Sequence, residues 1–164
     1  MKQATVSIIM GSTSDFPIMK EAVDFLNEME ISCSYSALSA HRTPELVIDY
    51  ATKARENGTK VIIAGAGGAA HLPGIIAACT SIPVIGVPVK SSNSVDGWDS
   101  ILSILQMPSG VPVATVALNG ARNAAILATQ ILAVNDEVIY QKLTAFKASM
   151  KKKVTDANVR LQNQ

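Results

Sequence analysis

The side chains best suited to chemistry lie in one short stretch of this mostly apolar sequence, ALSAHRTPEL at residues 37–46. It holds His41, one of the two histidines of the chain, directly before Arg42. A histidine exchanges a proton readily near neutral pH, and an arginine binds phosphate through two parallel hydrogen bonds. A lone histidine has a structural role more often than a catalytic one. The pair therefore indicates proton transfer beside a phosphorylated ligand only if other suitable segments lie next to it.

A serine-rich segment, GSTSD at residues 11–15, follows an apolar run and precedes a helical pattern. Backbone amides at the start of a helix and the hydroxyls of Ser12 and Ser14 can bind an anion such as phosphate. Asp15 would repel that phosphate, so we expect it to cap the helix or to accept hydrogen bonds from sugar hydroxyls. Taken alone, the segment is more typical of a helix cap than of a binding site.

A glycine-rich segment, GAGGAAHLPG at residues 65–74, places His71 at the start of a further helix. Its glycines allow the backbone to approach a flat ligand. GAGGAA resembles the dinucleotide-binding fingerprint, but that fingerprint follows the first strand and has an acidic residue about 20 positions later. The corresponding region here is the uncharged PVIGVPV. We therefore reject a dinucleotide, and since the sequence has neither a Cys/His cluster nor a Walker lysine we expect no cofactor and no metal.

Alternating strand and helix patterns place these three segments. Short apolar runs rich in β-branched residues predict strands at 5–10, 61–65, 83–88 and 112–118, and a weaker run predicts one at 32–38. Helical spacing predicts one helix that begins near Asp15 and Pro17, a second from Thr43 and Pro44 to Gly58, and others near 71–80, 98–106 and 121–134.

This alternation predicts an α/β fold, a flavodoxin-like three-layer αβα sandwich with a parallel sheet. Ligands of such folds bind beyond the carboxyl ends of the strands. The three polar segments should meet there.

Length and composition predict one domain over residues 1–164, with a core of small aliphatic residues, because 48% of the chain is apolar and only 4% aromatic. A net charge of +1 argues against a nucleic-acid partner. The uncharged run at 61–89 is long enough to cross a membrane, but its glycines and prolines favour buried strands and a helix instead. Two cysteines without metal spacing and a first segment unlike a signal peptide predict a cytoplasmic protein.

A C-terminal helical extension, residues 135–164, continues beyond the last predicted strand with enough chain for two helices. Apolar residues at helical spacing lie on a highly charged background: Val138, Ile139, Leu143, Phe146 and Met150. This pattern suits packing on another subunit, so we expect a homo-oligomer. The alternative is a helix that folds back onto its own domain.

Several motifs in fixed order together resemble one family. GSTSD, SAHRTPE, VIIAGAGGAAHLPG, PVIGVPV and DSILSILQMPSGVPVATVAL are similar to the class I N5-carboxyaminoimidazole ribonucleotide mutases of purine biosynthesis, over about residues 5–135, and the extension is similar too. The resemblance implies reversible exchange of that small nucleotide substrate with 4-carboxy-5-aminoimidazole ribonucleotide, without ATP, metal or biotin. It also implies an octamer.

The resemblance implies a role for each matching residue. His41 would be the catalytic acid/base, Arg42 would hold the 5′-phosphate, and Ser12 and Asp15 would bind the nucleotide. Further positions that match the lining of the family's site are Gly11, Ser14, Ser39, Ala40, Gly67, His71 and Leu72.

Two segments depart from the family pattern. NGARNAA at 119–125 is shortened, and KSSNSVDGWDS at 90–100 differs from the commoner loop. In the second we expect Trp98 to be a packing residue and Asp96 or Asp99 to be a helix cap. Two other functions remain open: a class II aminoimidazole ribonucleotide carboxylase that uses free CO2, and a non-catalytic module that binds a phosphorylated ligand.

Overall fold

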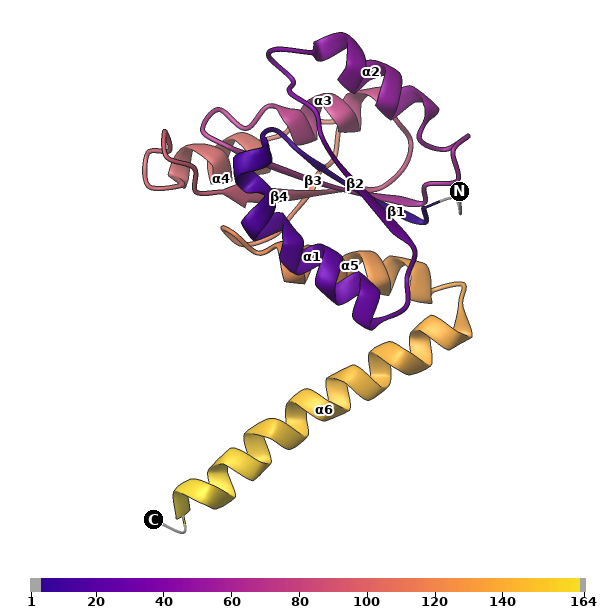
Figure 1. Ribbon diagram of the computed structural model, residues 1–164, viewed down its shortest axis with the longest axis vertical. Coiled ribbons are helices and arrows are strands. Elements are labelled where there is room, and N and C mark those ends of the chain that lie inside the picture. Colours follow the sequence, from indigo (N-terminus) through magenta and orange to yellow (C-terminus); the bar gives the residue numbers. More distant parts are fainter. Residues whose placement is uncertain (1–3, 163–164) are drawn as a thin grey trace.

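The computed structural model describes residues 4–162 and has a parallel sheet at its centre (Figure 1). Its strand order is β2-β1-β3-β4-β5. The strands are β1 (Val6–Met10), β2 (Cys33–Ala37), β3 (Val61–Gly67), β4 (Val84–Val89) and β5 (Ala114–Thr115). Nearly every residue of β1, β3 and β4 is buried, because these strands lie inside the sheet and helices cover both of its faces. The uncharged run at 61–89 forms β3, α3 and β4.

Helices on both faces make the three-layer αβα sandwich that the sequence predicts. Figure 1 shows α2, α3 and α4 on one face and α1 and α5 on the other. Their bounds are α1 (Phe16–Glu28), α2 (Pro44–Lys53), α3 (Leu72–Cys79), α4 (Trp98–Leu105) and α5 (Ala121–Ala133). Ile8 and Ile63 belong to the core under α1 and α5, whereas Ile9 and Ile62 belong to the core under α2 and α3. Within residues 4–162, none of the helices is both long enough and apolar enough to cross a bilayer.

The polar loops end where helices begin, and the sequence signals for those starts are confirmed. Asp15 and Thr43 occupy the N-cap positions of α1 and α2 but neither side chain makes a capping hydrogen bond, and each helix has a proline in its first turn. Gly58, with φ +83°, ends the turn that follows α2. The chain therefore enters α2 from the carboxyl edge of the sheet, and it enters α1 from the same edge through a short 3-10 helix, Thr13–Asp15.

The edge of the sheet beyond β4 differs from the prediction. The strand expected at 112–118 keeps only Ala114–Thr115. Pro112 has no N–H to donate. After Thr115 the chain stays beside β4 without forming further regular strand: the Val116 N–H donates to the Gly86 carbonyl and the Asn119 N–H to the Pro88 carbonyl. Trp98 is 64% exposed at the start of α4, so its assignment as a packing residue is wrong within this chain. Neither Asp96 nor Asp99 is the N-cap residue; Gly97 holds that position in a left-handed conformation.

The extension is one helix, α6 (Glu137–Gln162), rather than two. Its first part packs on the chain's own domain: Leu143 is buried, and Phe146 meets Phe25 with ring centroids 5.1 Å apart. Figure 1 shows the rest of α6 as an arm that leaves the body. Val154 and Leu161 on this arm are exposed. The first part thus folds back, as the alternative interpretation expects, and within residues 4–162 nothing covers these apolar residues of the arm.

Candidate active site

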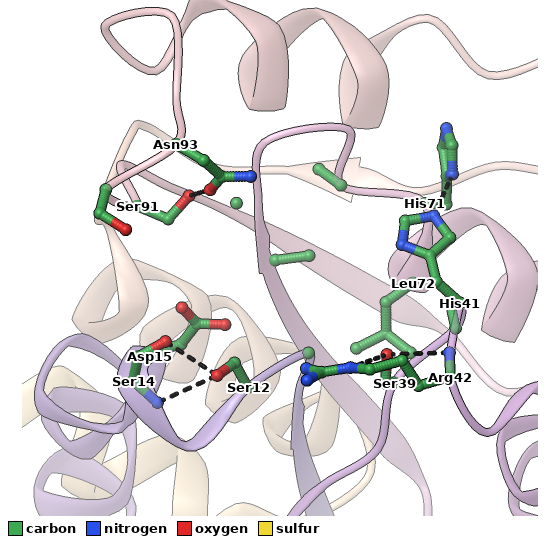
Figure 2. A pocket seen from close by; sticks show the side chains of 16 residues that line it. Ser12, Ser14, Asp15, Ser39, His41, Arg42, His71, Leu72, Ser91 and Asn93 are labelled. Carbon is green, nitrogen blue, oxygen red and sulfur yellow. Dashed lines mark hydrogen bonds between the residues drawn. The ribbon is translucent and has the colours of Figure 1, made fainter.

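Loops at the carboxyl ends of β1, β2, β3 and β4 surround one cavity of about 430 Å³ (Figure 2). Every residue predicted for the site lines it: Gly11, Ser12, Ser14, Asp15, Ser39, Ala40, His41, Arg42, Gly67, His71 and Leu72. The structure therefore brings together segments that are far apart in the sequence. The part that each residue plays in binding or catalysis stays a prediction.

The loop after β1 brings hydroxyls and one carboxylate into the cavity. Ser12 Oγ accepts hydrogen bonds from the Ser14 N–H (3.3 Å) and the Ser14 hydroxyl (2.8 Å). Asp15 is only 4% exposed, and its carboxylate faces the cavity in Figure 2. Burial raises the pKa of Asp15, and hydrogen bonds from Ser12 and Ser14 offset part of that rise. An ionised Asp15 is therefore short of solvation and would gain from hydroxyl donors on a ligand.

Ser39 and Thr43 shape the turn after β2 and orient Arg42. The Thr43 hydroxyl donates to the Ser39 carbonyl (3.1 Å), and Thr43 Oγ1 accepts from the Ser39 N–H (3.2 Å). Ser39 Oγ accepts from the backbone N–H of Arg42 (3.2 Å) and from its Nε (3.4 Å). Figure 2 shows the guanidinium reaching along the cavity floor toward the side of Ser12. Among the described residues no carboxylate pairs with Arg42, so its two terminal nitrogens are available to an anion.

The two histidines of the chain contact each other at the opposite side of the cavity. His41 Nε2 lies 2.7 Å from His71 Nδ1, and the rings meet edge to face with centroids 4.8 Å apart. In such a contact one nitrogen carries the hydrogen and the other accepts it. Ala70, at φ +48°, turns the chain just before His71 and so helps to set the position of its ring.

The loop after β4 also lines the cavity, and the sequence did not predict this. Ser91, Ser92 and Asn93, in the loop after β4, line the cavity together with Ala66 and Ala70. Serine and asparagine are common in any loop, so their types carry no chemical signal. Their position was the available clue, because β4 ends at the same edge of the parallel sheet as β1, β2 and β3.

The fold places the chain in the class of flavodoxin-like α/β proteins, and the cavity lies beyond the carboxyl ends of the parallel strands, where ligands of such folds bind. A crystal structure of Treponema denticola PurE matches the chain with a TM-score of 0.85 and 28% identity, covering 95% of this chain and 97% of that one. A second Treponema denticola structure gives a TM-score of 0.86. The arrangement of strands and helices is thus shared with known structures.

Sequence comparisons identify the family. A family model described as AIR carboxylase matches residues 5–153. An N5-carboxyaminoimidazole ribonucleotide mutase from Pyrococcus horikoshii is 56% identical over 157 residues, which cover 96% of this chain and 88% of that protein. The mutase from Bacillus subtilis is 53% identical over 161 residues, 97% of this chain and 99% of its own length. The chain belongs to the AIR carboxylase family, which confirms the resemblance seen in its motifs.

Proposed function

We propose that this protein converts N5-carboxyaminoimidazole ribonucleotide reversibly into 4-carboxy-5-aminoimidazole ribonucleotide, a step of purine biosynthesis. The observation that carries the proposal is the shared cavity of His41, Arg42 and Asp15, which supplies a proton carrier, a cation and a hydroxyl acceptor. The high identity to relatives that are named mutases supports the same reaction.

Charge complementarity orients the nucleotide in the cavity. The 5′-phosphate would bind the terminal nitrogens of Arg42 and the Ser12 and Ser14 loop, since Arg42 is the cation among the lining residues. The ribose hydroxyls would donate to Asp15, whose carboxylate repels the phosphate but needs hydrogen-bond donors. The aminoimidazole ring of the nucleotide would then lie between the glycine segment after β3 and His41.

The chemistry needs one proton carrier. Protonation of N5 breaks the bond between N5 and the carboxyl carbon, and the bonding electrons return to nitrogen as CO2 leaves. The electron-rich C4 attacks that CO2, and removal of the C4 proton restores the aromatic ring. His41 would donate the first proton and accept the second, so it ends the cycle unchanged. The cavity holds CO2 near C4 between the two steps.

His71 would act as a positioning residue for this proton carrier. Its Nδ1 lies 2.7 Å from Nε2 of His41, so the hydrogen bond between them ties the tautomer of His41 to that of His71 and holds the ring in place. A fixed ring and tautomer would present the other nitrogen of His41 to the substrate.

We also propose that residues 1–164 form one catalytic domain that assembles into a homo-octamer, with residues 135–164 at a subunit interface. The exposed apolar residues Val154 and Leu161 on α6, and Trp98 and Leu102 on α4, support an interaction surface. Light scattering of the purified protein tests this, and a monomer would contradict it. The free thiols of Cys33 and Cys79 support a reducing cytoplasmic location.

An isotope experiment tests the reaction. N5-carboxyaminoimidazole ribonucleotide labelled at its carboxyl carbon is mixed with the protein in buffer that contains unlabelled CO2. We expect the C4-carboxylated product to keep the label, because the cavity retains CO2 between the two steps. Loss of the label, with product formed from aminoimidazole ribonucleotide and dissolved CO2, would indicate a carboxylase. Absence of product with either substrate would leave the non-catalytic module.

Replacing Asp15 with Asn should raise stability and weaken binding at once. Burial raises the pKa of Asp15 above its ordinary value of 3.8. The stability that comes from keeping this carboxyl group protonated is fully present below pH 3.8. It is lost as the pH rises through the raised pKa, because the buried group must then ionise. The neutral amide of the Asp15→Asn variant avoids that loss, so thermal unfolding at pH 7 should show a higher Tm, with the difference shrinking toward pH 3. Calorimetry at pH 7 should show nucleotide affinity lower by roughly 10-fold, as expected when a charged acceptor of hydroxyl groups is removed.

Both measurements have a clear contrary result. An unchanged or lower Tm at pH 7 would mean that burial of the carboxylate does not destabilise the fold. Unchanged affinity would mean that the ribose does not contact Asp15.

A further inference from the structure

Asn93 lies at the cavity end of the loop between β4 and α4, residues 90–97, opposite the Ser12 side (Figure 2). Its Oδ1 accepts a 2.7 Å hydrogen bond from the Ser91 hydroxyl. Its Nδ2 lies over Gly68, 3.0 Å from the place where a Cβ of that residue would be. Within residues 4–162 no acceptor is hydrogen-bonded to Nδ2. The side chain thus has its acceptor satisfied and two N–H donors available beside the cavity.

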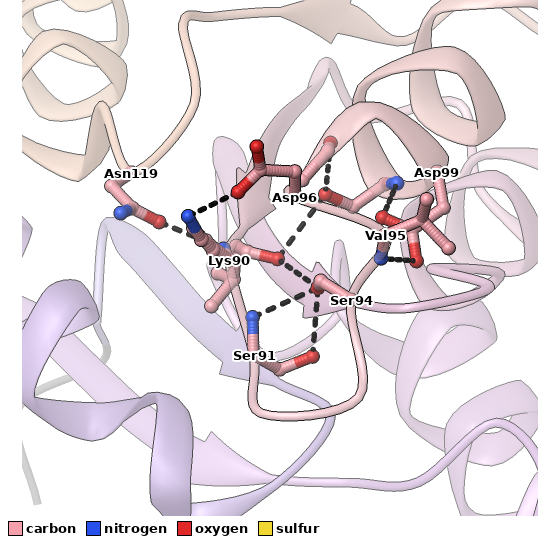
Figure 3. A network of polar contacts seen from close by, with 10 residues as sticks. Lys90, Ser91, Ser94, Val95, Asp96, Asp99 and Asn119 are labelled. Carbon is pink, nitrogen blue, oxygen red and sulfur yellow. Dashed lines mark hydrogen bonds and ion pairs between the residues drawn. The ribbon is translucent and has the colours of Figure 1, made fainter.

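The loop that carries Asn93 is tied at several points, so the position of the amide is defined (Figure 3). Ser94 Oγ accepts from the backbone N–H groups of Ser91 (2.9 Å) and Gly68 (3.4 Å), which joins the loop to the glycine segment after β3. Lys90 forms an ion pair with Asp96 across the base of the loop. The loop also packs closely against Gly67, where a Cβ would overlap with the Ser91 side chain.

The charges that line the cavity leave one part of the nucleotide without a partner. In the proposed orientation Arg42 binds the phosphate, and the buried carboxylate of Asp15 would repel a second carboxylate placed beside it. The carboxyl group of the substrate therefore needs neutral donors, and Asn93 offers two of them over the glycine segment against which the ring would lie. N5 and C4 are close neighbours on the nucleotide, so one donor can follow the carboxyl group from one to the other.

On this basis we propose that the Asn93 amide hydrogen-bonds the carboxylate of substrate and product and holds CO2 between them. The inference rests on the proposed function, and it makes Asn93 the residue that distinguishes carboxylated from uncarboxylated aminoimidazole ribonucleotide. It also assigns a role to a segment in which this chain departs from the common family loop.

The test compares two ligands by calorimetry: 4-carboxy-5-aminoimidazole ribonucleotide and aminoimidazole ribonucleotide, which lacks the carboxyl group. Asn93→Ala removes the donors without adding charge. Asn93→Asp keeps an acceptor for the Ser91 hydroxyl, and so keeps the loop, but replaces the donors by a carboxylate. Asn57→Asp makes the same charge change in an exposed turn outside the cavity and is the control. Thermal unfolding checks that every variant is folded.

We expect Asn93→Ala to lower the affinity for the carboxylated nucleotide by about 10-fold or more, because hydrogen bonds to a charged group are lost. The affinity for the uncarboxylated nucleotide should fall by less than about 2-fold. Asn93→Asp should widen that difference, and Asn57→Asp should leave both affinities unchanged. Equal losses for the two ligands, or no loss for the carboxylated one, would overturn the proposal. Wild-type protein that binds the carboxylated nucleotide without interconverting it would contradict the proposed function and leave this comparison readable. Wild-type protein that binds neither nucleotide would overturn both.

Discussion

Replacing His41 with Asn is expected to abolish turnover while nucleotide binding stays within a few-fold of wild type. Arg42 and Asp15, the residues we propose to bind the phosphate and the ribose, lie in other parts of the cavity and do not depend on the imidazole. His41 would carry the proton in both bond-changing steps, so its loss should cost at least the roughly 10²–10⁴-fold that general acid/base catalysis supplies. Steady-state rates and calorimetric titration of the same preparation measure the two effects separately.

A glutamine at the same position is the matched control. Its amide nitrogen can occupy the place of Nε2 and keep the hydrogen bond to His71, but it cannot exchange a proton. We expect His41→Gln to be as inactive as His41→Asn, because the proton is required and not only the contact. Near wild-type rates in either variant would refute the proton-carrier role, and activity in the glutamine variant alone would reduce His41 to a positioning residue.

The central sheet and its helices can be predicted from the sequence because their signals are local. β1, β3 and β4 are unbroken apolar runs that lie inside a parallel sheet covered on both faces. The length of β5 could not be predicted, since the apolar run at 112–118 does not reveal that only Ala114–Thr115 forms regular strand beside β4. Trp98 shows the same limit, because the apolar character of a residue does not reveal whether its own chain covers it.

The site could be predicted where unusual residue types mark it. The loops after β1, β2 and β3 contain serines before a helix, a His-Arg pair and a glycine run, and parallel strands bring their carboxyl ends to one edge. The contact between His41 and His71 could not be predicted, because it joins residues 30 positions apart through side-chain orientation. Asn93 could not be predicted as a cavity residue, because asparagine is common in loops and its position is set by the hydrogen bonds that hold its loop.

Replacing Arg42 with Ala should weaken nucleotide binding by roughly 10²–10⁴-fold, because a phosphate loses two charge-assisted hydrogen bonds, each worth about 1.5–3 kcal/mol. The effect should appear mainly as a higher KM, since the phosphate does not react and its binding is uniform between ground state and transition state. Arg42→Lys keeps the charge without the planar fork and should fall between wild type and Arg42→Ala. Arg55→Ala, in an exposed turn outside the cavity, should bind as wild type does.

The phosphate itself provides the decisive comparison for Arg42. The dephosphorylated riboside should bind weakly to the wild-type protein and equally weakly to Arg42→Ala. It has no phosphate for Arg42 to bind, so the mutation removes no interaction from its complex. If the mutation weakened the riboside as much as the ribotide, Arg42 would act on the fold of the turn after β2 instead of on the phosphate. The structure argues against such an effect on the turn. The Ser39 hydroxyl accepts hydrogen bonds from both the backbone N–H and the side chain of Arg42, and only the side-chain bond is lost in the alanine variant. The backbone bond and the two Thr43 bonds should keep the turn in place, so we expect the loss to be confined to ligands that carry the phosphate.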